Sequence, residues 1–211
     1  MLDRFSPVKI VVVSPAQDHP QEAAVLGELF AAGLERYHAR KPDWTRDQLE
    51  AWLRALPSAW RPRLVLHQHH ELVASLALGG RHWRDDGTAP LAPTRDGKLT
   101  SRSCHDLIAL PAALGRYDAV LFAPVFPSLS KPGHGPHDDA LFDELSALLA
   151  HRSAAERRTC VLALGGITAE TAPRALALGF DGVAALGAIW QAADPVHAFA
   201  QLSSSLACHA A

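Results

Sequence analysis

The sequence has few cysteines, almost no net charge and no long apolar run. Its three cysteines, Cys104, Cys160 and Cys208, show no C-x-x-C spacing, which argues against a disulfide scaffold and favours a reducing cytoplasm. A formal net charge of −2 over 211 residues lacks the basic field of a nucleic-acid-binding protein. No stretch approaches the ~18 apolar residues of a membrane span, and the N-terminus has no signal cleavage motif. We therefore expect a cytoplasmic protein without a nucleic-acid or membrane partner.

What the sequence does contain is a regular alternation of short apolar segments and amphipathic helix-length segments. A predicted helix over 21–33 ends at Gly33, and a second over 45–56 begins at Thr45, a good N-cap residue. Eight segments are predicted as strands: 9–16, 34–40, 63–68, 80–83, 98–104, 118–124, 159–166 and 182–187. All but one of these strands precede a predicted helix, which favours a parallel sheet.

The exception follows the fourth strand, where residues 84–97 are broken by proline and glycine. We therefore predict one domain over 1–211, a (β/α)8 TIM barrel whose fourth helix is short or degenerate. An open doubly wound sheet is the alternative. It is weakened because no G-x-G-x-x-G motif follows the first strand.

Histidines gather near the predicted strand ends, where a barrel carries its chemistry. The segment "LHQHHEL" holds His67, His69 and His70, and His67 and His69 would share one face of a strand. Either a metal site or polar lining of a pocket would explain this pattern. His38, His67, His82 and His105 are candidates for a general acid–base, although His105 is rather expected to cap or pack at the start of the next helix.

Two glycine-containing turns predict a phosphate-binding site. "LALGGIT" (162–168) and "GFDGVAALGAIW" (179–190) place turns after the seventh and eighth strands. Gly165, Gly166, Leu186 and Gly187 are the candidate phosphate-binding positions. The loop "APVFPSLSKPGHG" (123–135) follows the sixth strand beside them. Its hydroxyls and lysine indicate either a loop that grips an anionic substrate or a rigid surface turn.

These motifs resemble those of one known family. "APVFPSLSKPG" resembles the "GPIFPTxTK" motif of thiamin phosphate synthases, "VLALGGIT" their "VxAIGGI", and "GFDGVAALGAIW" their "GADGVAVVSAI". "RSCH" (102–105) and "YHARKP" (37–42) are similar to the "RSVH" and "xHLRxx" of the related TenI-type thiazole tautomerases. The order and spacing of these segments follow those of the thiamin phosphate synthase/TenI family.

The resemblance implies a thiamin-biosynthesis enzyme that binds phosphorylated small molecules and joins hydroxymethylpyrimidine diphosphate to thiazole phosphate, releasing diphosphate. It makes a homodimer the default assembly. It assigns the thiazole contacts to Ser128 and Ser130 and the diphosphate contact to Lys131, with Arg40 and Lys41 as further cations. The remaining positions it marks as catalytic or substrate-binding are His38, Ser103, Pro124, His67, Gln68 and His82.

Two departures from the family leave the reaction open. The synthases hold Mg²⁺ through an Asn-Asp pair where this chain has His67 and Gln68, a poor ligand set for a hard cation. Asp85 or Asp86 is the candidate for the second magnesium carboxylate of the family. The tautomerases use a histidine where this chain has Pro124. A thiazole tautomerase and a non-catalytic binder of thiazole or thiamin phosphate are therefore alternatives to the synthase.

Overall fold

The computed structural model describes residues 10–127 and 139–207, and these form a closed parallel β-barrel. Each strand pairs with its neighbour in chain order, and β8 closes the barrel on β1. The strands are β1 (Ile10–Val13), β2 (Arg36–Ala39), β3 (Leu64–Leu66), β4 (Gly80–Trp83), β5 (Leu99–Cys104), β6 (Ala119–Phe122), β7 (Cys160–Leu164) and β8 (Gly182–Ala185). The predicted (β/α)8 barrel is confirmed.

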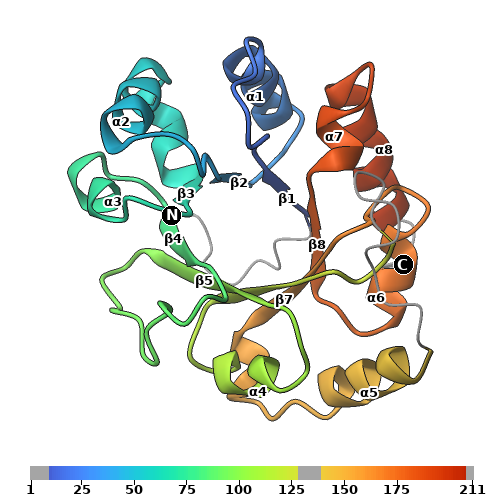
Figure 1. Ribbon diagram of the computed structural model, residues 1–211. Helices are drawn as coiled ribbons and strands as arrows, with labels where there is room; N and C mark the ends of the chain where they lie inside the picture. The colour runs from blue at the N-terminus through green and yellow to red at the C-terminus, as the bar shows by residue number, and fades with distance from the viewer. Residues whose placement is uncertain (1–9, 128–138, 208–211) are drawn as a thin grey trace.

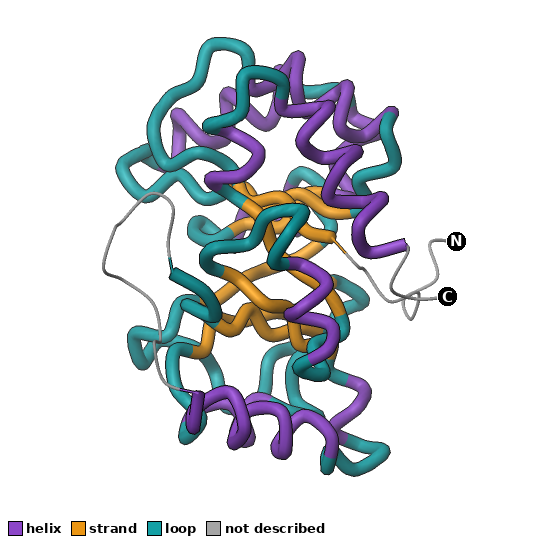
Figure 2. The backbone as a smooth tube through the Cα atoms, turned by 90° about the vertical axis from the view of Figure 1, so that its right-hand side faces the viewer, coloured by secondary structure: helices purple, strands orange, loops and turns teal. Residues whose placement is uncertain are grey.

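Helices surround the barrel in Figure 1 and lie on both sides of the orange strands in Figure 2. The α-helices are α1 (Glu22–Ala31), α2 (Arg46–Ala55), α3 (Glu71–Ser75), α4 (Ala109–Ala113), α5 (Asp139–Ala150), α6 (Ala172–Ala177), α7 (Gly187–Trp190) and α8 (Pro195–Ala207). The 3-10 helices are η1 (Ser58–Arg63) and η2 (Glu156–Arg158). Residues 84–98, between β4 and β5, contain no helix, as their prolines and glycines predict. No helix in the described ranges is long and apolar enough to cross a membrane.

Local signals set the ends of two early helices. The Thr45 hydroxyl accepts from the Gln48 backbone N–H, and the Gln48 side chain accepts from the Thr45 N–H, which completes a capping box at α2. Beyond α1, Gly33 adopts a φ of +101°, which glycine tolerates best. The predicted cap at Thr45 is confirmed, whereas α1 ends at Ala31 with Ala32 as its C-cap, and Gly33 follows that cap.

The interior of the barrel is divided into an apolar half and a polar half. Val11, Val13, Leu121, Leu162 and Ala184 form an apolar cluster that comes from β1, β6, β7 and β8. The other half, built from β2 to β5, holds the buried polar side chains His38, His67, His82 and Ser101. Alternate residues of the strands face outward and pack under the helices. A cavity at this end of the barrel would therefore have one apolar side and one polar side.

Candidate active site

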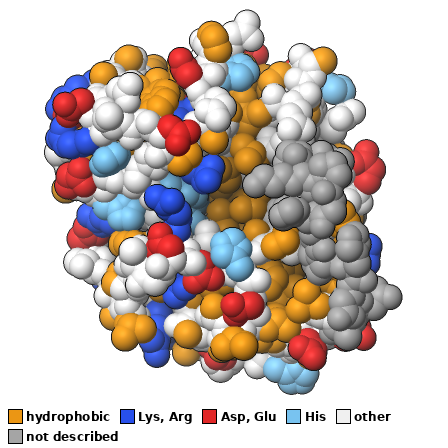
Figure 3. Space-filling view, in the orientation of Figure 1, with side chains coloured by type: hydrophobic (Ala, Val, Ile, Leu, Met, Phe, Trp, Pro, Cys, Tyr) orange, Lys and Arg blue, Asp and Glu red, His pale blue; other side chains and the backbone are white. Residues whose placement is uncertain are grey.

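A cavity of about 890 Å³ lies at the carboxyl ends of the barrel strands. In Figure 3 it is the hollow at the centre of the face, with hydrophobic side chains on its floor and charged and histidine side chains on its left. Its polar lining residues are Gln17, Arg40, Asp43, His67, Arg84, Asp85, Asp86, Ser103 and His105. The position matches that of active sites in this architecture.

The structure brings about half of the predicted site residues to this cavity. Those that line it are Arg40, His67, Ser103, Gly165, Gly166, Leu186 and Gly187. His38 and His82 are fully buried and lie behind the lining, so neither makes direct contact with a molecule in the cavity. Gln68 and Pro124 are also absent from the lining. Ser128, Ser130 and Lys131 lie outside the described residues.

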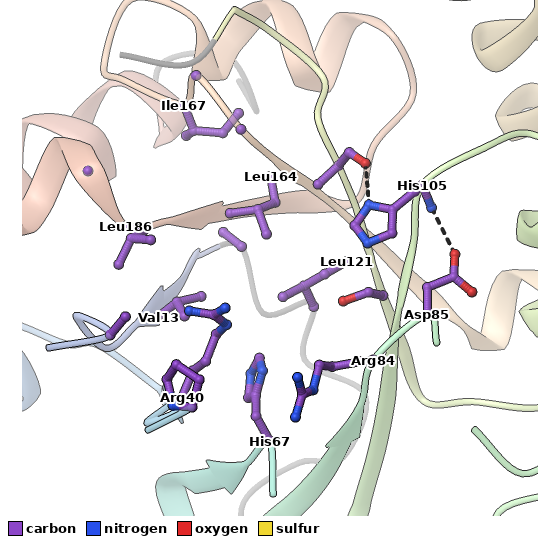
Figure 4. Close-up of a pocket in the computed structure, with 18 of the residues that line it drawn as sticks. Val13, Arg40, His67, Arg84, Asp85, His105, Leu121, Leu164, Ile167 and Leu186 are labelled. Carbon is purple, nitrogen blue, oxygen red and sulfur yellow. Dashed lines mark hydrogen bonds between the residues drawn. The ribbon is translucent and has the colours of Figure 1, made fainter. Parts of the chain in front are cut away.

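Arg40, His67 and Arg84 lie along one side of the cavity in Figure 4. The backbone of Arg40 is fixed by Ser14, whose hydroxyl accepts from the Arg40 N–H at 2.8 Å and donates to the Arg40 carbonyl at 2.9 Å. Among the described residues, Arg40 has no carboxylate within ion-pair distance. Its positive charge is therefore available to an anion in the cavity.

His105 and Asp85 are linked at the mouth of the cavity. The Asp85 carboxylate accepts from Arg102 Nη2 at 2.6 Å and from the His105 backbone N–H at 3.2 Å. The His105 ring donates from Nδ1 to the Ala123 carbonyl at 2.7 Å, as Figure 4 shows. Asp106, not His105, accepts from the first N–H of α4 at 2.6 Å. The expectation that His105 caps or packs at the helix start is therefore wrong, because its exposed ring lines the cavity.

The opposite side of the cavity is built from the turns after β7 and β8. Gly165 and Gly166 have φ values of +94° and +62°. A Cβ at Gly166 would lie 2.5 Å from the Pro127 carbonyl, so only glycine lets the loop after β6 approach this turn. The N–H groups of Gly165, Gly166 and Gly187 donate to no described backbone acceptor. These amides are available to a phosphate oxygen, and that role stays a prediction from the two turns.

Behind the polar wall, three histidines from neighbouring strands form a buried cluster. His38 Nδ1 and His67 Nε2 are 3.0 Å apart and share one hydrogen bond. The rings of His67 and His82 stack with centroids 4.0 Å apart at an interplanar angle of 26°. His69 does not share this face, because β3 ends at Leu66 and the chain turns there, giving His69 a φ of +54°.

Two serines fix the tautomer of His82. The Ser101 hydroxyl donates to the Arg81 carbonyl at 3.3 Å, so it accepts from Nδ1–H of His82 at 3.0 Å. Nε2 of the same ring then carries the lone pair, and the Ser103 hydroxyl donates to it at 3.0 Å. Ser103 therefore presents only oxygen lone pairs to the cavity. It is a hydrogen-bond acceptor for a substrate N–H or O–H group.

Burial keeps the three imidazoles neutral. Desolvation, with a smaller effect of Arg36, lowers the pKa of His38 to about 3. Desolvation also lowers the pKa values of His67 and His82 well below the usual value, and neighbouring histidines lower them further. None of the three residues is suited to hold a proton at neutral pH.

Lys41 does not supply a cation to the site, although it is next to Arg40 in the sequence. Its ammonium group is fully buried and donates to the Glu22 carboxylate, to the Pro15 carbonyl at 2.9 Å and to the Gln17 carbonyl at 3.2 Å. Tyr37 also donates to Glu22, at 2.7 Å. The expectation that Lys41 binds a diphosphate is wrong. The lysine instead ties the loop after β1 to the end of β2.

The residues present do not fit a magnesium site of the family's kind. The Gln68 amide nitrogen donates to the Lys41 carbonyl, and Asp85 is paired with Arg102. Asp86 accepts from the Thr88 N–H at 3.0 Å. In the described ranges, the group of side chains that converges as metal ligands consists of imidazoles, not of the oxygen donors that Mg²⁺ prefers.

Besides His105, whose ring was expected at the helix start, the polar lining residues Gln17, Asp43 and Arg84 were not predicted from the sequence. Arg84 directly follows β4, so the strand-end rule that found His67 would also have found it. Gln17 and Asp43 lie further along the loops after β1 and β2, where no sequence signal distinguishes them from surface residues.

The family model and the curated relatives of similar sequence indicate one family. The family model described as thiamine monophosphate synthase matches residues 10–189. A thiamine-phosphate synthase of Methylobacillus flagellatus is 33% identical over 180 residues, covering 82% of this chain and 80% of the relative. That of an Azoarcus species is 34% identical over 170 residues, covering 77% and 78%.

The fold is also found among solved structures. A thiamine phosphate pyrophosphorylase from Bacteroides thetaiotaomicron superposes with a TM-score of 0.76 at 24% identity, covering 94% of this chain and 98% of that one. One from Pyrococcus furiosus has a TM-score of 0.75 at 17% identity, covering 97% and 98%. At these identities the two structures support the barrel fold.

Proposed function

The chain belongs to the thiamine monophosphate synthase family, and on that premise we propose that it joins hydroxymethylpyrimidine diphosphate to thiazole phosphate, releasing diphosphate. The observation that carries the proposal is the cavity within the matched region. It has Arg40 on one side and the amides of Gly165, Gly166 and Gly187 on the other. Two anionic groups can thus be held apart, one at each side.

We assign the thiazole phosphate to the glycine side. The amides of Gly166 and Gly187 are uncharged donors that suit a phosphate held throughout the reaction. The apolar side chains Leu164, Ile167 and Leu186, labelled in Figure 4, line the same cavity and suit the thiazole ring. Ser128 and Ser130 are proposed as further thiazole contacts from the family resemblance alone.

The diphosphate belongs on the arginine side. In the reaction the thiazole nitrogen forms a bond to the pyrimidine methylene carbon, while the bond from that carbon to the diphosphate oxygen breaks with its electron pair. Negative charge on the departing diphosphate is stabilised by preorganised cations. Arg40 and Arg84 supply them from the described residues, and Lys131 is proposed as a third from the resemblance. Ser103, as an acceptor, suits the amino group of the pyrimidine.

The comparisons lend no support to a thiazole tautomerase or to a non-catalytic binder. We further propose that residues 1–211 act as one domain in the cytoplasm, as a homodimer. Sedimentation equilibrium of the purified chain at enzyme concentrations tests the dimer. A single species with the 22.6 kDa mass of one chain would refute it.

The function is tested by incubating the purified protein with both substrates, with and without Mg²⁺, and measuring thiamin phosphate. We expect product, and a loss of turnover in Arg40→Ala. Arg54→Ala, which removes an exposed arginine of α2, is the matched control and should retain activity. Absence of product under both conditions would refute the synthase assignment. Turnover of the thiazole carboxylate tautomer instead would identify an isomerase.

A further inference from the structure

The cluster of His38, His67 and His82 has no role in the proposed reaction, yet its geometry is that of a ligand set. One ring nitrogen from each histidine can be chosen so that all three nitrogens lie within 4.8 Å of one another. The side chains come from β2, from the residue after β3 and from β4, which are adjacent strands of the barrel. Only His67 reaches the cavity, and the other two lie behind it.

The ring positions are close to those of three imidazoles on one ion. The ring centroid of His38 lies 5.2 Å from that of His67 and 5.3 Å from that of His82. The ring centroids of His67 and His82 are 4.0 Å apart. With metal–nitrogen bonds of ~2.1 Å and angles between about 90° and 110°, the centroids would be roughly 4.6–5.3 Å apart. Two pairs already have this spacing, and the third must open by roughly 0.6 Å.

The surrounding hydrogen bonds orient one ligand. Ser101 holds Nδ1–H of His82, which leaves the Nε2 lone pair for a metal. Such an outer partner commonly fixes the tautomer of a ligating histidine. Ser103 donates to Nε2 in the structure and lines the cavity, so its hydroxyl can turn toward the cavity when a metal takes that lone pair.

Neutral imidazoles prefer a particular class of metal. They suit Zn²⁺ and other late first-row ions, whereas Mg²⁺ requires oxygen ligands. We infer that His38, His67 and His82 form a binding site for a divalent transition-metal ion of the Zn²⁺ class. Of the three ligands, His67 lines the cavity and would connect the site to it. The site includes His67, one of the two positions where the family resemblance places magnesium ligands. It would bind a different class of ion, through imidazole nitrogens instead of oxygens.

The inference rests on the arrangement of the three rings and not on the proposed synthase reaction. A binding measurement on the full chain therefore tests it separately from any activity. The chain is first stripped with a chelator and then titrated with Zn²⁺ by equilibrium dialysis, with excess Mg²⁺ present. We expect one Zn²⁺ per chain that Mg²⁺ does not displace.

Three variants locate the site. His67→Ala should weaken that Zn²⁺ binding by at least ~100-fold, and Ser101→Ala by roughly 10-fold through the loss of the outer hydrogen bond. His105→Gln is the matched control, because it removes a cavity histidine outside the cluster, and its Zn²⁺ affinity should equal that of the wild type. Unchanged affinity in His67→Ala would overturn the inference.

A spectroscopic measurement on the wild type guards against a variant that does not fold. X-ray absorption at the zinc edge of the one-to-one complex should show three imidazole nitrogens and no sulfur. A first shell of oxygens, or one containing cysteine sulfur, would overturn the inference, as would the failure of the stripped wild type to bind Zn²⁺.

Discussion

The buried histidines predict a pH dependence of stability that can be calculated for His38. Its pKa is about 3 in the folded protein because burial removes the ring from water. In the unfolded chain the pKa of a histidine is about 6.5. Below that pH the unfolded chain binds a proton that the folded protein does not. The free energy of unfolding is therefore highest above pH ~6.5 and falls as the pH decreases toward ~3.

The magnitude follows from these two pKa values. Between about pH 7.5 and pH 5.0, protonation of one such histidine in the unfolded chain lowers the free energy of unfolding by about 2 kcal/mol. A typical domain is stabilised by about 5–15 kcal/mol, so this change is a substantial fraction of the total free energy of unfolding. His67 and His82 act in the same direction, because their pKa values are also lowered.

Urea denaturation of the chelator-treated protein at the two pH values measures this effect. His38→Asn keeps a polar side chain but removes the titrating ring. Between about pH 7.5 and pH 5.0, the decrease in its free energy of unfolding should therefore be about 2 kcal/mol smaller than the decrease in the wild type. His197→Asn, which removes an exposed histidine of α8, should behave like the wild type. Equal losses in the wild type and His38→Asn would refute the reasoning, whatever the absolute stability of the variant.

Three other perturbations test the site and its supports. Arg40→Ala should lower kcat/KM for the pyrimidine diphosphate by roughly 10–100-fold, since a charge-assisted hydrogen bond contributes about 1.5–3 kcal/mol; an unchanged value in steady-state assays would remove its role. Lys41→Met should cost roughly 3–5 kcal/mol in urea denaturation because the buried Glu22 carboxylate loses its cationic partner and keeps only the Tyr37 hydrogen bond, and adding Glu22→Gln should recover part of it. A loss below about 1 kcal/mol would contradict that account. Gly166→Ala should destabilise by roughly 1–3 kcal/mol and raise KM for thiazole phosphate. Gly33→Ala, with positive φ but no neighbour within 4 Å, is its control and should cost less; equal losses would exclude the steric explanation.

Sequence patterns predicted the barrel because its elements are encoded locally. The apolar runs of strands such as β1 and β6, the cap at Thr45 and the prolines of 84–98 are all signals that affect only the few residues around them. Strand ends then indicate the mouth of the barrel, which is why Arg40, His67 and Ser103 were found. The glycine turns were found for the same reason.

The errors concern side-chain partners that are distant in the sequence. Lys41 was expected in the cavity because it follows Arg40, but its carboxylate partner Glu22 lies 19 residues earlier. Asp85 was considered as a metal ligand, yet it is neutralised by Arg102, 17 residues later. Neither pairing leaves a periodic signal. Whether a charged side chain at a strand end faces the cavity therefore depends on its ion-pair partner, which its position in the sequence does not reveal.

The division of the barrel interior explains why the resemblance is strong at one side of the cavity and weak at the other. β6, β7 and β8 keep the glycine turns, and their inward residues Leu121, Leu162 and Ala184 are apolar. β2 to β4 carry the three histidines, and a buried imidazole is stable there only when its nitrogens have partners. Ser101 and Ser103 occupy both nitrogens of His82, so the buried imidazole of His82 depends on both serines. His67 thus both replaces a family magnesium ligand and completes the imidazole set. A change at one of these positions alone would leave a buried nitrogen unpaired, at a cost of about 1–3 kcal/mol.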